Sequence, residues 1–359
     1  MEFSRVDTNF SVQTAEDGTV KDFYRIPCAP FTLYGVTYFE REGRFSRMPE
    51  AEAEKISENV KMLSKHTSGG RLRFSTDSDF LEVRATYSSL QGYPRMTYVG
   101  SAGFLLLEDA ERGAFPFVGS QIAPTSEDKT GFVARVPTAA DGKVHDYTLY
   151  FPLYNDVTSL EIGLRHGAKV GEGKKCRDLK PILYYGSSIT QGGCASRPDN
   201  CYQGFIFKWN NVDYLNFGFS GNARGERAAA EYLSRIPCSL FVYDYDFNAP
   251  TAEHLEKTHA PFFEIFRRAQ PDTPVLILSK IDCESDPAAD ARRAVIRKTV
   301  ERARRAGDKN VYFLNGDQFF GKHDRESCTV DSCHPTDLGF YRMAKCIYRK
   351  MISIDPIFG

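Results

Sequence analysis

Five short apolar runs in the second half of the chain constrain its fold more than any other feature. Each run is nearly all apolar, and longer stretches with helical spacing lie between the runs. The runs are 182–185, 214–217, 240–245, 275–279 and 311–314, and the clearest helical stretches are 226–236, 251–269, 288–306 and 335–351. Continuous apolar strands that alternate with helices are typical of a parallel sheet covered on both faces. The pattern predicts a small doubly wound α/β domain with five strands.

The first half of the chain has a different texture, with apolar residues at every second position. From Arg71 to Leu164 this alternation recurs in short runs separated by Gly, Pro, Asn and Asp, as in Leu81/Val83/Ala85. Such runs predict an antiparallel β-sandwich of jelly-roll type. One exception, Pro49–Ser64, has helical spacing, and we expect it to cover an end of the sandwich.

The polar stretch Gly167–Lys180, rich in glycine and lysine, suggests a domain boundary. A chain of 359 residues also exceeds the size at which a single core stops growing. We therefore expect two domains, a sandwich over residues 1–175 and an α/β domain over residues 176–359.

Charge and composition exclude several function classes. Lys and Arg number 46 against 47 Asp and Glu, so no overall field attracts nucleic acid or an anionic membrane. No apolar run approaches the ~18 residues of a membrane span, and the first residues lack the apolar core of a signal peptide. We expect a cytoplasmic protein whose nine cysteines are mostly reduced. The arginine-rich stretch 288–306 lacks interleaved aromatic residues, which favours a solvated helix face over a nucleic-acid surface.

A candidate nucleophile follows the first strand of the α/β domain. The run ends at Gly186-Ser187-Ser188, and in doubly wound folds the site lies beyond the carboxyl ends of the strands. A serine hydroxyl needs a base, and the base needs an orienting acid. Asp331-Ser-Cys-His334-Pro335 offers both, because positions three apart in a turn place side chains as neighbours. We expect Asp331 to hold Nδ1 of His334, Nε2 to face Ser188, and Pro335 to begin the last helix.

Acyl transfer also requires hydrogen-bond donors aimed at the negative charge that develops on the carbonyl oxygen. Gly221 follows the second strand and can offer a backbone N–H with no side chain in the way. Asn248 follows the third strand and can offer its side-chain amide. Both positions lie at the same edge of the predicted sheet as Ser188, so we expect them to form an oxyanion hole.

Taken together, these motifs resemble the SGNH (GDSL-type) hydrolase superfamily, whose sequence blocks supply a serine, a glycine, an asparagine and a histidine. The matching segments, in chain order, are Gly186-Ser-Ser188-Ile, Ser220-Gly221-Asn, Asn248 and Asp331-x-x-His334-Pro. The resemblance implies a flavodoxin-like sheet and an ester hydrolase without metal or other cofactor. Ser188 would be the nucleophile, His334 the base and Asp331 its orienter, with Ser188 N–H, Gly221 N–H and the Asn248 amide holding the oxyanion.

The chain departs from the common family pattern at two places. Ser187 replaces the usual Asp, and the block around Asn248 lacks the Gly-x-Asn-Asp form. Both variations resemble a subgroup that begins with Gly-Ser/Thr-Ser-Ile-Thr-Gln-Gly and carries an N-terminal sandwich with a Gly-x-Asp-Leu-Tyr signature. Here Gly103-Phe-Leu-Leu-Leu107 stands in place of that signature. The subgroup implies removal of short acyl groups, O-acetyl groups above all, from carbohydrates.

Other functions remain open at this point. A lysophospholipase-type esterase for short-chain lipids is the main alternative, and a sugar- or nucleotide-binding module without catalysis is another. The Gly-x-Ser-x-Gly motif of α/β-hydrolases does not occur around Ser188. A zinc site would draw on the thiols beside the predicted site, but their spacing does not suit a structural site. The sequence favours over it a close approach of two thiols, Cys194 to Cys201 or Cys328 to Cys333. We interpret Tyr202, Phe205 and Trp209 as core packing rather than a sugar platform.

Overall fold

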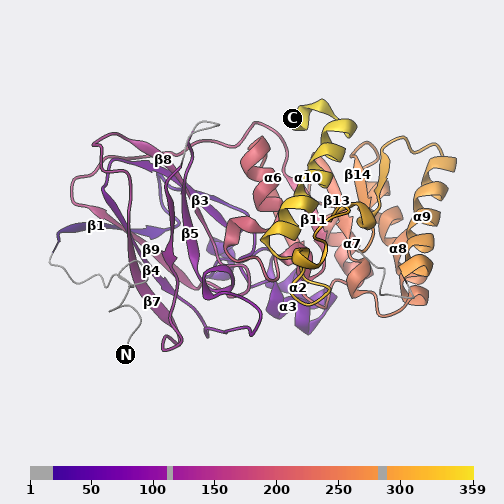
Figure 1. Cartoon of the computed structure of the whole chain (residues 1–359), viewed down its shortest axis with the longest axis horizontal. Coiled ribbons are helices and arrows are strands. Elements are labelled where there is room, and N and C mark those ends of the chain that lie inside the picture. The colour runs from indigo at the N-terminus through magenta and orange to yellow at the C-terminus, as the bar shows by residue number, and fades with distance from the viewer. Residues whose placement is uncertain (1–18, 111–115, 282–288) are drawn as a thin grey trace.

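The computed structural model describes residues 19–110, 116–281 and 289–359. Figure 1 shows the strands of the first half gathered at one end of an elongated molecule and a helix-covered sheet at the other. No helix in the described ranges combines the length and the apolar character needed to cross a membrane.

The first half forms two antiparallel sheets packed face to face. One sheet has the order β1-β9-β4-β7, with β1 (Lys21–Ile26), β9 (Ser159–Arg165), β4 (Phe80–Thr86) and β7 (Gly131–Pro137). The other has the order β10-β3-β8-β5-β6, with β2 (Thr32–Tyr34) pairing with β3; its strands are β10 (Val170–Gly171), β3 (Arg71–Thr76), β8 (His145–Tyr150), β5 (Phe104–Glu108) and β6 (Val118–Ile122). Alternate residues such as Leu81, Val83 and Ala85 point into the shared core. The predicted sandwich is confirmed.

The second half contains a parallel sheet with the order β12-β11-β13-β14-β15. These strands are β12 (Tyr214–Gly218), β11 (Ile182–Gly186), β13 (Leu240–Asp244), β14 (Val275–Leu278) and β15 (Val311–Leu314). In sequence order this is 2-1-3-4-5, the flavodoxin-like arrangement. In the register of β11 with its neighbours, Gly186 lies beside Gly218 and Asp244, so the three strands end together. The predicted doubly wound sheet is therefore confirmed.

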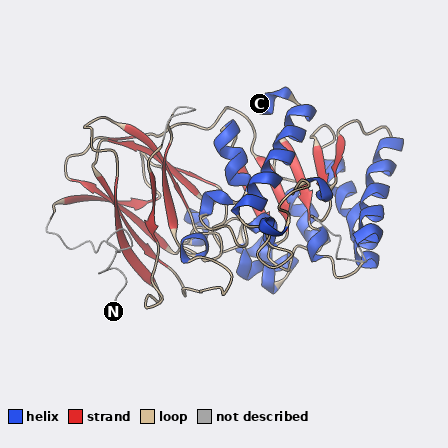
Figure 2. Ribbon diagram, viewed as in Figure 1, coloured by secondary structure: helices blue, strands red, loops and turns tan. Residues whose placement is uncertain are grey.

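Helices cover both faces of this sheet (Figure 2). α6 (Tyr202–Asn210) and α10 (Asp337–Ile354) pack on the face that carries Tyr184. α7 (Arg227–Leu233), α8 (Ala252–Ala269) and α9 (Ala289–Arg305) pack on the face that carries Tyr185. The shorter elements are α1 (Phe39–Glu42), α4 (Tyr98–Ser101), α5 (Ser188–Gln191) and the 3₁₀ turns η3 (Pro198–Asn200), η4 (Asp246–Asn248), η5 (Gly316–Gln318), η6 (Glu326–Cys328) and η7 (Pro356–Phe358).

The helical segment of the first half lies elsewhere than predicted. It forms α2 (Glu50–Ile56) and α3 (Glu58–Leu63), which are separated at Ser57. The Ser57 hydroxyl accepts the N–H of Val60 at 3.1 Å and so starts the second helix. The apolar residues of the pair belong to the core of the α/β sheet, beside those of α7. The expectation that this segment covers an end of the sandwich is wrong, because its apolar face packs on the α/β domain.

Buried contacts join the two halves of the chain. One continuous apolar cluster joins Leu105 and Leu153 of the first half to Phe207 and Tyr214 of the second. Arg71, on β3, is fully buried and donates to the backbone oxygen of Tyr214 at 2.7 Å and to Asp213 at 2.9 Å. The boundary at residue 175 stays a prediction, and the interface next to it is packed like a core.

The arginines of α9 are mostly engaged within the chain. Arg292 is buried and donates to the backbone oxygens of Asp246 at 2.9 Å and Ala249 at 2.8 Å. Arg293 pairs with Asp317 at 2.7 Å and Arg302 with Glu264 at 2.9 Å. The prediction of a solvated face is wrong for Arg292, which braces the turn after β13. Residue 288, where the predicted helix begins, lies outside the described residues.

Stability should depend on pH through His259, which is buried on α8 and shares a hydrogen bond of 2.9 Å with Thr299. Burial lowers the pKa of His259 from 6.5 to about 3. Between those values the unfolded chain binds a proton that the folded protein excludes, so this contribution to stability is complete above pH 6.5 and is lost as the pH falls toward 3. Each such group contributes a slope of up to about 1.4 kcal/mol per pH unit.

The variant His259→Gln should therefore show a shallower loss of unfolding free energy between pH 7 and pH 5 than the parent. Urea unfolding at each pH measures the slope, which is independent of any constant cost of the substitution. The same substitution at His323, an exposed histidine, is the control. Parallel pH profiles for the parent and His259→Gln would contradict the prediction.

Candidate active site

Ser188 lies in a tight turn at the carboxyl end of β11. The strand ends at Gly186, and the one-turn helix α5 starts at Ser188. Its start is capped by Ser187, whose hydroxyl accepts the N–H of Ile189 at 3.2 Å. A Cβ on Gly186 would lie 2.1 Å from the Thr190 hydroxyl, so only glycine allows α5 to fold back so closely. The turn places Ser188 at the carboxyl end of the sheet, where 9% of the residue's surface is exposed.

The structure brings the predicted serine, histidine and aspartate together. The Ser188 hydroxyl lies 2.9 Å from Nε2 of His334, and Nδ1 of the same ring lies 2.9 Å from Oδ2 of Asp331. The other carboxylate oxygen accepts the backbone N–H of His334 at 2.7 Å and that of Cys333 at 3.2 Å. Because Nδ1 faces a carboxylate, the ring keeps its proton there and presents the lone pair of Nε2 to Ser188.

The local structure around His334 differs from the predicted helix start. Pro335 forms an isolated bridge with Thr329, and the backbone N–H of Val330 donates to the oxygen of His334 at 2.9 Å. α10 begins only at Asp337, where the Thr336 hydroxyl caps it by accepting the N–H of Gly339 at 3.3 Å. The expectation that Pro335 is the first helical residue is wrong, because Thr336 provides the capping hydroxyl that proline lacks. His334 is held by a closed turn instead.

Asp331 is strongly favoured in its charged form. Partial burial raises its pKa, but the backbone N–H and ring of His334 and the guanidinium of Arg95 outweigh this and lower the pKa from 3.8 to about 2. Arg95 precedes α4 in the first half of the chain, and its Nη1 donates to Oδ2 of Asp331. Its side chain is 64% exposed, so it covers the carboxylate at the rim of the site. Sequence reasoning missed this residue, because nothing in the local pattern links it to a partner 236 positions away.

The two predicted oxyanion residues meet at the turn after β12. Gly221 has a φ of 69°, and a Cβ there would meet nothing within 4 Å. Across the described parts of the chain, neither its N–H nor that of Ser188 donates a hydrogen bond to a protein atom. The Asn248 amide donates one N–H to the oxygen of Phe219 at 2.9 Å, which leaves its second N–H for a ligand. The N–H of Ser220 donates to the Gln191 side chain at 3.0 Å and ties this turn to α5.

A buried cation from the first half supports the same turn. Arg47 is 1% exposed and donates to the backbone oxygens of Gly218 at 2.7 Å and Asn216 at 3.0 Å. Its guanidinium lies 4.9 Å from the centre of the Phe219 ring. Burial lowers the pKa of Arg47 from 12.5 to about 9. The contact holds the backbone that leads to Gly221, and neither spacing nor composition pointed to it.

Thiols near the site do not form a metal centre or a disulfide in the structure. None of the eight cysteines within the described ranges forms a disulfide with another, and this holds for Cys194, Cys201, Cys328 and Cys333. The ninth, Cys283, lies outside those ranges. Within them, no group of three or more His, Cys, Asp or Glu side chains is arranged to hold a metal ion.

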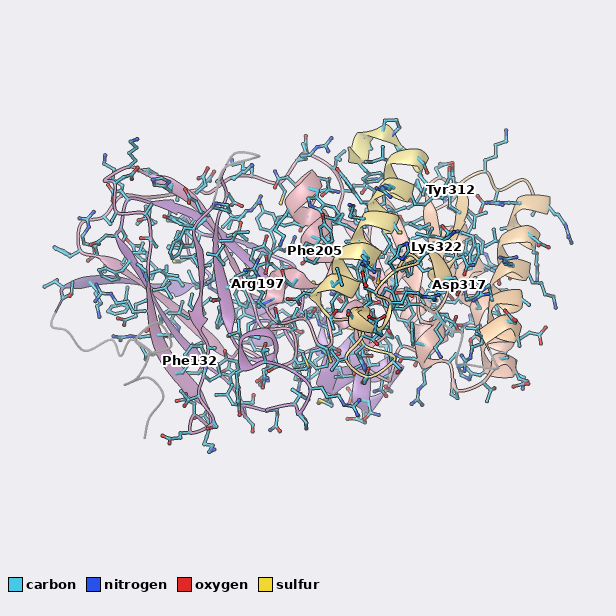
Figure 3. The ribbon with its side chains drawn as sticks, in the orientation of Figure 1. Phe132, Arg197, Phe205, Tyr312, Asp317 and Lys322 are labelled. Carbon is cyan, nitrogen blue, oxygen red and sulfur yellow. The ribbon has the colours of Figure 1, made fainter. Side chains whose placement is uncertain are left out.

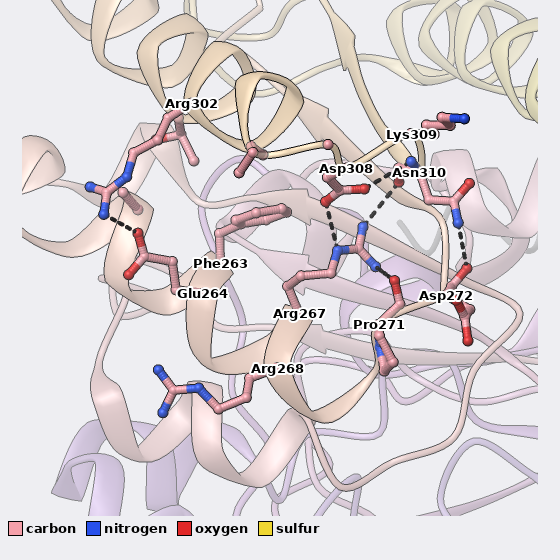
Figure 4. Close-up of a pocket in the computed structure, with 15 residues that line it drawn as sticks. Phe263, Glu264, Arg267, Arg268, Pro271, Asp272, Arg302, Asp308, Lys309 and Asn310 are labelled. Atoms are coloured by element: carbon pink, nitrogen blue, oxygen red, sulfur yellow. Dashed lines mark hydrogen bonds and ion pairs between the residues drawn. The ribbon is translucent and has the colours of Figure 1, made fainter.

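A hollow of about 710 Å³ lies away from these residues, between α8 and α9 (Figure 4). Two ion pairs lie along it, Arg267 with Asp308 at 2.8 Å and Arg302 with Glu264 at 2.9 Å. None of the predicted site residues lines it. The chemistry suggested by the sequence therefore lies at the strand ends and not in this hollow.

Comparison with protein families gives two adjacent matches. Residues 179–353 match the GDSL-like lipase/acylhydrolase family. Residues 22–170 match the N-terminus of SGNH-hydrolase-type esterases, a domain named for its Gly-x-Asp-Leu-Tyr signature. No curated protein matches the chain significantly.

Several solved structures share the whole architecture. A protein described as a GDSL-like lipase from Bacteroides ovatus is 28% identical, with a TM-score of 0.82, and the match covers 93% of this chain and 98% of that one. A salicylyl-acyltransferase from a tetracycline biosynthetic pathway is 19% identical, with a TM-score of 0.75 and coverage of 93% and 97%. An acetyl xylan esterase from the rumen bacterium Butyrivibrio proteoclasticus is 12% identical, with a TM-score of 0.58 and coverage of 95% and 100%.

Proposed function

This chain belongs to the SGNH (GDSL-like) hydrolases, and we propose that it is a serine esterase that removes short acyl groups, O-acetyl groups above all, from carbohydrates. The observation that carries the proposal is the continuous hydrogen-bonded series from Ser188 through His334 to Asp331. Among the described residues, the backbone N–H groups of Ser188 and Gly221 donate to no protein atom. A nucleophile, an oriented base and vacant donors are the three components that acyl transfer requires.

In the proposed reaction the Ser188 oxygen attacks the acyl carbon while its proton passes to Nε2 of His334. The oxyanion that forms accepts hydrogen bonds from the N–H groups of Ser188 and Gly221 and from the Asn248 amide. Asp331 stabilises the imidazolium, which then gives its proton to the departing alcohol. Water, deprotonated by the same imidazole, cleaves the acyl-enzyme, and Ser188 regains its proton from His334.

The surroundings of the proposed nucleophile favour a small acyl group. A Cβ on Gly193 would lie 2.8 Å from the Tyr154 hydroxyl and 3.3 Å from Cδ2 of His334, so the space beside the base is tight. The Tyr154 hydroxyl itself donates to the backbone oxygen of Ser188 at 3.1 Å. The carbohydrate part of the proposal is supported by the neighbours in fold, which include a family two carbohydrate esterase from Clostridium thermocellum.

Hydrolysis of a matched ester series tests this proposal. The parent should cleave 4-nitrophenyl acetate with a kcat/KM at least tenfold above that for the octanoyl ester, since a tight polar site disfavours a long chain. It should release acetate from acetylated xylo- or manno-oligosaccharides, and EDTA should not change the rates. Ser188→Ala, assayed beside it, measures the background. Preference for the octanoyl ester or for a lysophospholipid would support the lipid alternative, and no cleavage of any ester would refute the mechanism.

A further inference from the structure

A cluster of four aromatic rings lies where α6 packs against α10, and we call it the α6–α10 aromatic cluster. Its members are Phe205, Trp209, Tyr341 and Tyr348. The centre of the Trp209 ring lies 5.9 Å from that of Tyr341 and 5.3 Å from that of Tyr348. Tyr341 is 40% exposed and Trp209 is half-buried. Figure 3 labels Phe205 on α6, close to α10. Tyr202 is fully buried, and Phe205 and Trp209 are partly buried and pack against the same apolar core, as predicted.

The cluster forms one wall of a hollow of about 460 Å³. Trp209, Tyr341 and Tyr348 line it from the two helices. A second hollow of about 170 Å³, at the junction with the sandwich, shares lining residues with the first, among them Lys174 and Asn211. The two hollows therefore form one groove along the flank of the molecule, large enough for more than one ring of a chain-like ligand.

The larger hollow carries positive charge, while Glu108 and Asp109 line the smaller one. Lys174, Lys345 and Arg349 line the larger hollow, and none of the ion pairs found among the described residues involves them, although Lys174 lies near the Asp109 carboxylate. Lys345 lies 5.3 Å from the centre of the Tyr341 ring. Lys208 also lines the groove, but it is paired with Asp199 at 2.5 Å. Three cations beside aromatic rings favour an anionic ligand.

A buried amide in the same wall lacks a partner. Asn210 lines the larger hollow and is only 4% exposed. Its Oδ1 accepts the N–H of Val212 at 3.0 Å, while its Nδ2 donates no hydrogen bond to any described residue. The Nδ2 atom is itself buried, so this unmet donor lies behind the wall of the hollow and does not face a ligand bound there.

We propose that this groove is a second, non-catalytic site that binds an acidic saccharide chain bearing uronate groups. The aromatic rings would pack on the C–H faces of the sugars, and the three cations would pair with the carboxylates. Tyr348 lies twelve residues after the cap of α10, about 18 Å along the helix, so a chain bound there must extend along α10 to reach the turn that carries His334. Such tethering raises the effective concentration of ester groups at Ser188, so the inference rests on the proposed function.

Calorimetric titration of the full-length protein with oligogalacturonate of six to eight residues tests this site. The parent should bind it, more weakly as salt rises, while xylohexaose should bind at least tenfold more weakly. The exposed-surface double variant Lys345→Glu/Arg349→Glu and the single variant Trp209→Ala should each weaken binding at least tenfold. Both should keep kcat for 4-nitrophenyl acetate within twofold of the parent. Tyr312→Ala, which removes a half-buried tyrosine beneath Lys350 outside the groove, is the matched control.

Each remaining outcome bears on the site directly. Ser188→Ala should bind oligogalacturonate as the parent does, because the groove is separate from the nucleophile. Loss of binding in that variant, tighter binding of a thymidine oligonucleotide than of oligogalacturonate, or unchanged binding in the charge-reversal variant would each overturn the proposal. A protein that binds oligogalacturonate through Trp209 but cleaves no ester would uphold this site and refute the proposed function.

Discussion

Replacing Ser188 with alanine is expected to lower kcat for 4-nitrophenyl acetate by about 10⁴- to 10⁶-fold, with little change in KM. The alanine leaves His334 and Asp331 in place but removes the hydroxyl oxygen that lies 2.9 Å from Nε2 of His334. The residual rate would come from the oxyanion donors and from substrate binding, which need no nucleophile. Steady-state kinetics and the melting temperature measure the two effects separately.

The adjacent serine is the matched control. Ser187 is fully buried, and its hydroxyl accepts the N–H of Ile189 at 3.2 Å, so its role is to cap α5. Ser187→Ala should cost about 1 kcal/mol of stability and leave kcat within a few-fold of the parent. If Ser187→Ala removed the activity and Ser188→Ala kept it, the assignment of the nucleophile would be wrong.

Replacing Asp331 with asparagine is expected to lower kcat by about 10³- to 10⁴-fold without unfolding the protein. One oxygen of this side chain accepts two backbone N–H groups, at 2.7 and 3.2 Å, and an asparagine keeps them only by placing its oxygen there. Its NH₂ group then faces Nδ1 of His334, which must become the acceptor. The ring proton moves to Nε2, and the ring can no longer take a proton from Ser188.

Two further variants separate this tautomer effect from a simple loss of charge. Asp337→Asn removes a nearby carboxylate that bonds the Ser196 N–H at 2.9 Å and does not contact His334, so its kcat should stay within a few-fold of the parent. Arg95→Met removes the exposed partner of Asp331 and should cost less than tenfold, because exposed ion pairs contribute little. Activity of Asp331→Asn within tenfold of the parent would show that His334 keeps its tautomer without the carboxylate.

Much of the fold could be predicted from the period of apolar residues. The switch from alternation to continuous runs near Pro181 placed all five strands of the parallel sheet within about two residues of their observed ends. Periodicity shows that one face of a helix is buried but not which part of the protein covers it. The pattern of residues 49–64 therefore could not show that α2 and α3 pack on the α/β domain and not on the sandwich. The start of α10 was misplaced because Pro335 and Thr336 both suit a helix start, and the capping hydroxyl prevailed.

Some residues of the candidate site could be predicted from the sequence, and others could not. Residues carried by short motifs at strand ends, such as Ser188 and Gly221, could be named from the sequence because parallel strands bring their carboxyl ends to one edge. Arg95 and Arg47 could not be named, since each acts on backbone or carboxylate groups more than 160 positions away. Such contacts depend on how the two halves pack, which no local pattern records.

The contacts of Arg47 also bear on whether the two halves of the chain unfold separately or together. The guanidinium of Arg47 comes from the first half of the chain and donates to the backbone oxygens of Asn216 and Gly218 in the second half. Leu153, also of the first half, belongs to the apolar cluster that the two halves share. Separating the halves would break these buried hydrogen bonds and open the shared apolar cluster to water, so neither half keeps its full stability alone. We therefore expect the sandwich and the α/β domain to unfold together and to give a single heat-absorption peak in scanning calorimetry. Exchanging either half alone for an unrelated domain is therefore expected to destabilise the other, because the buried interface would lose its matching surface.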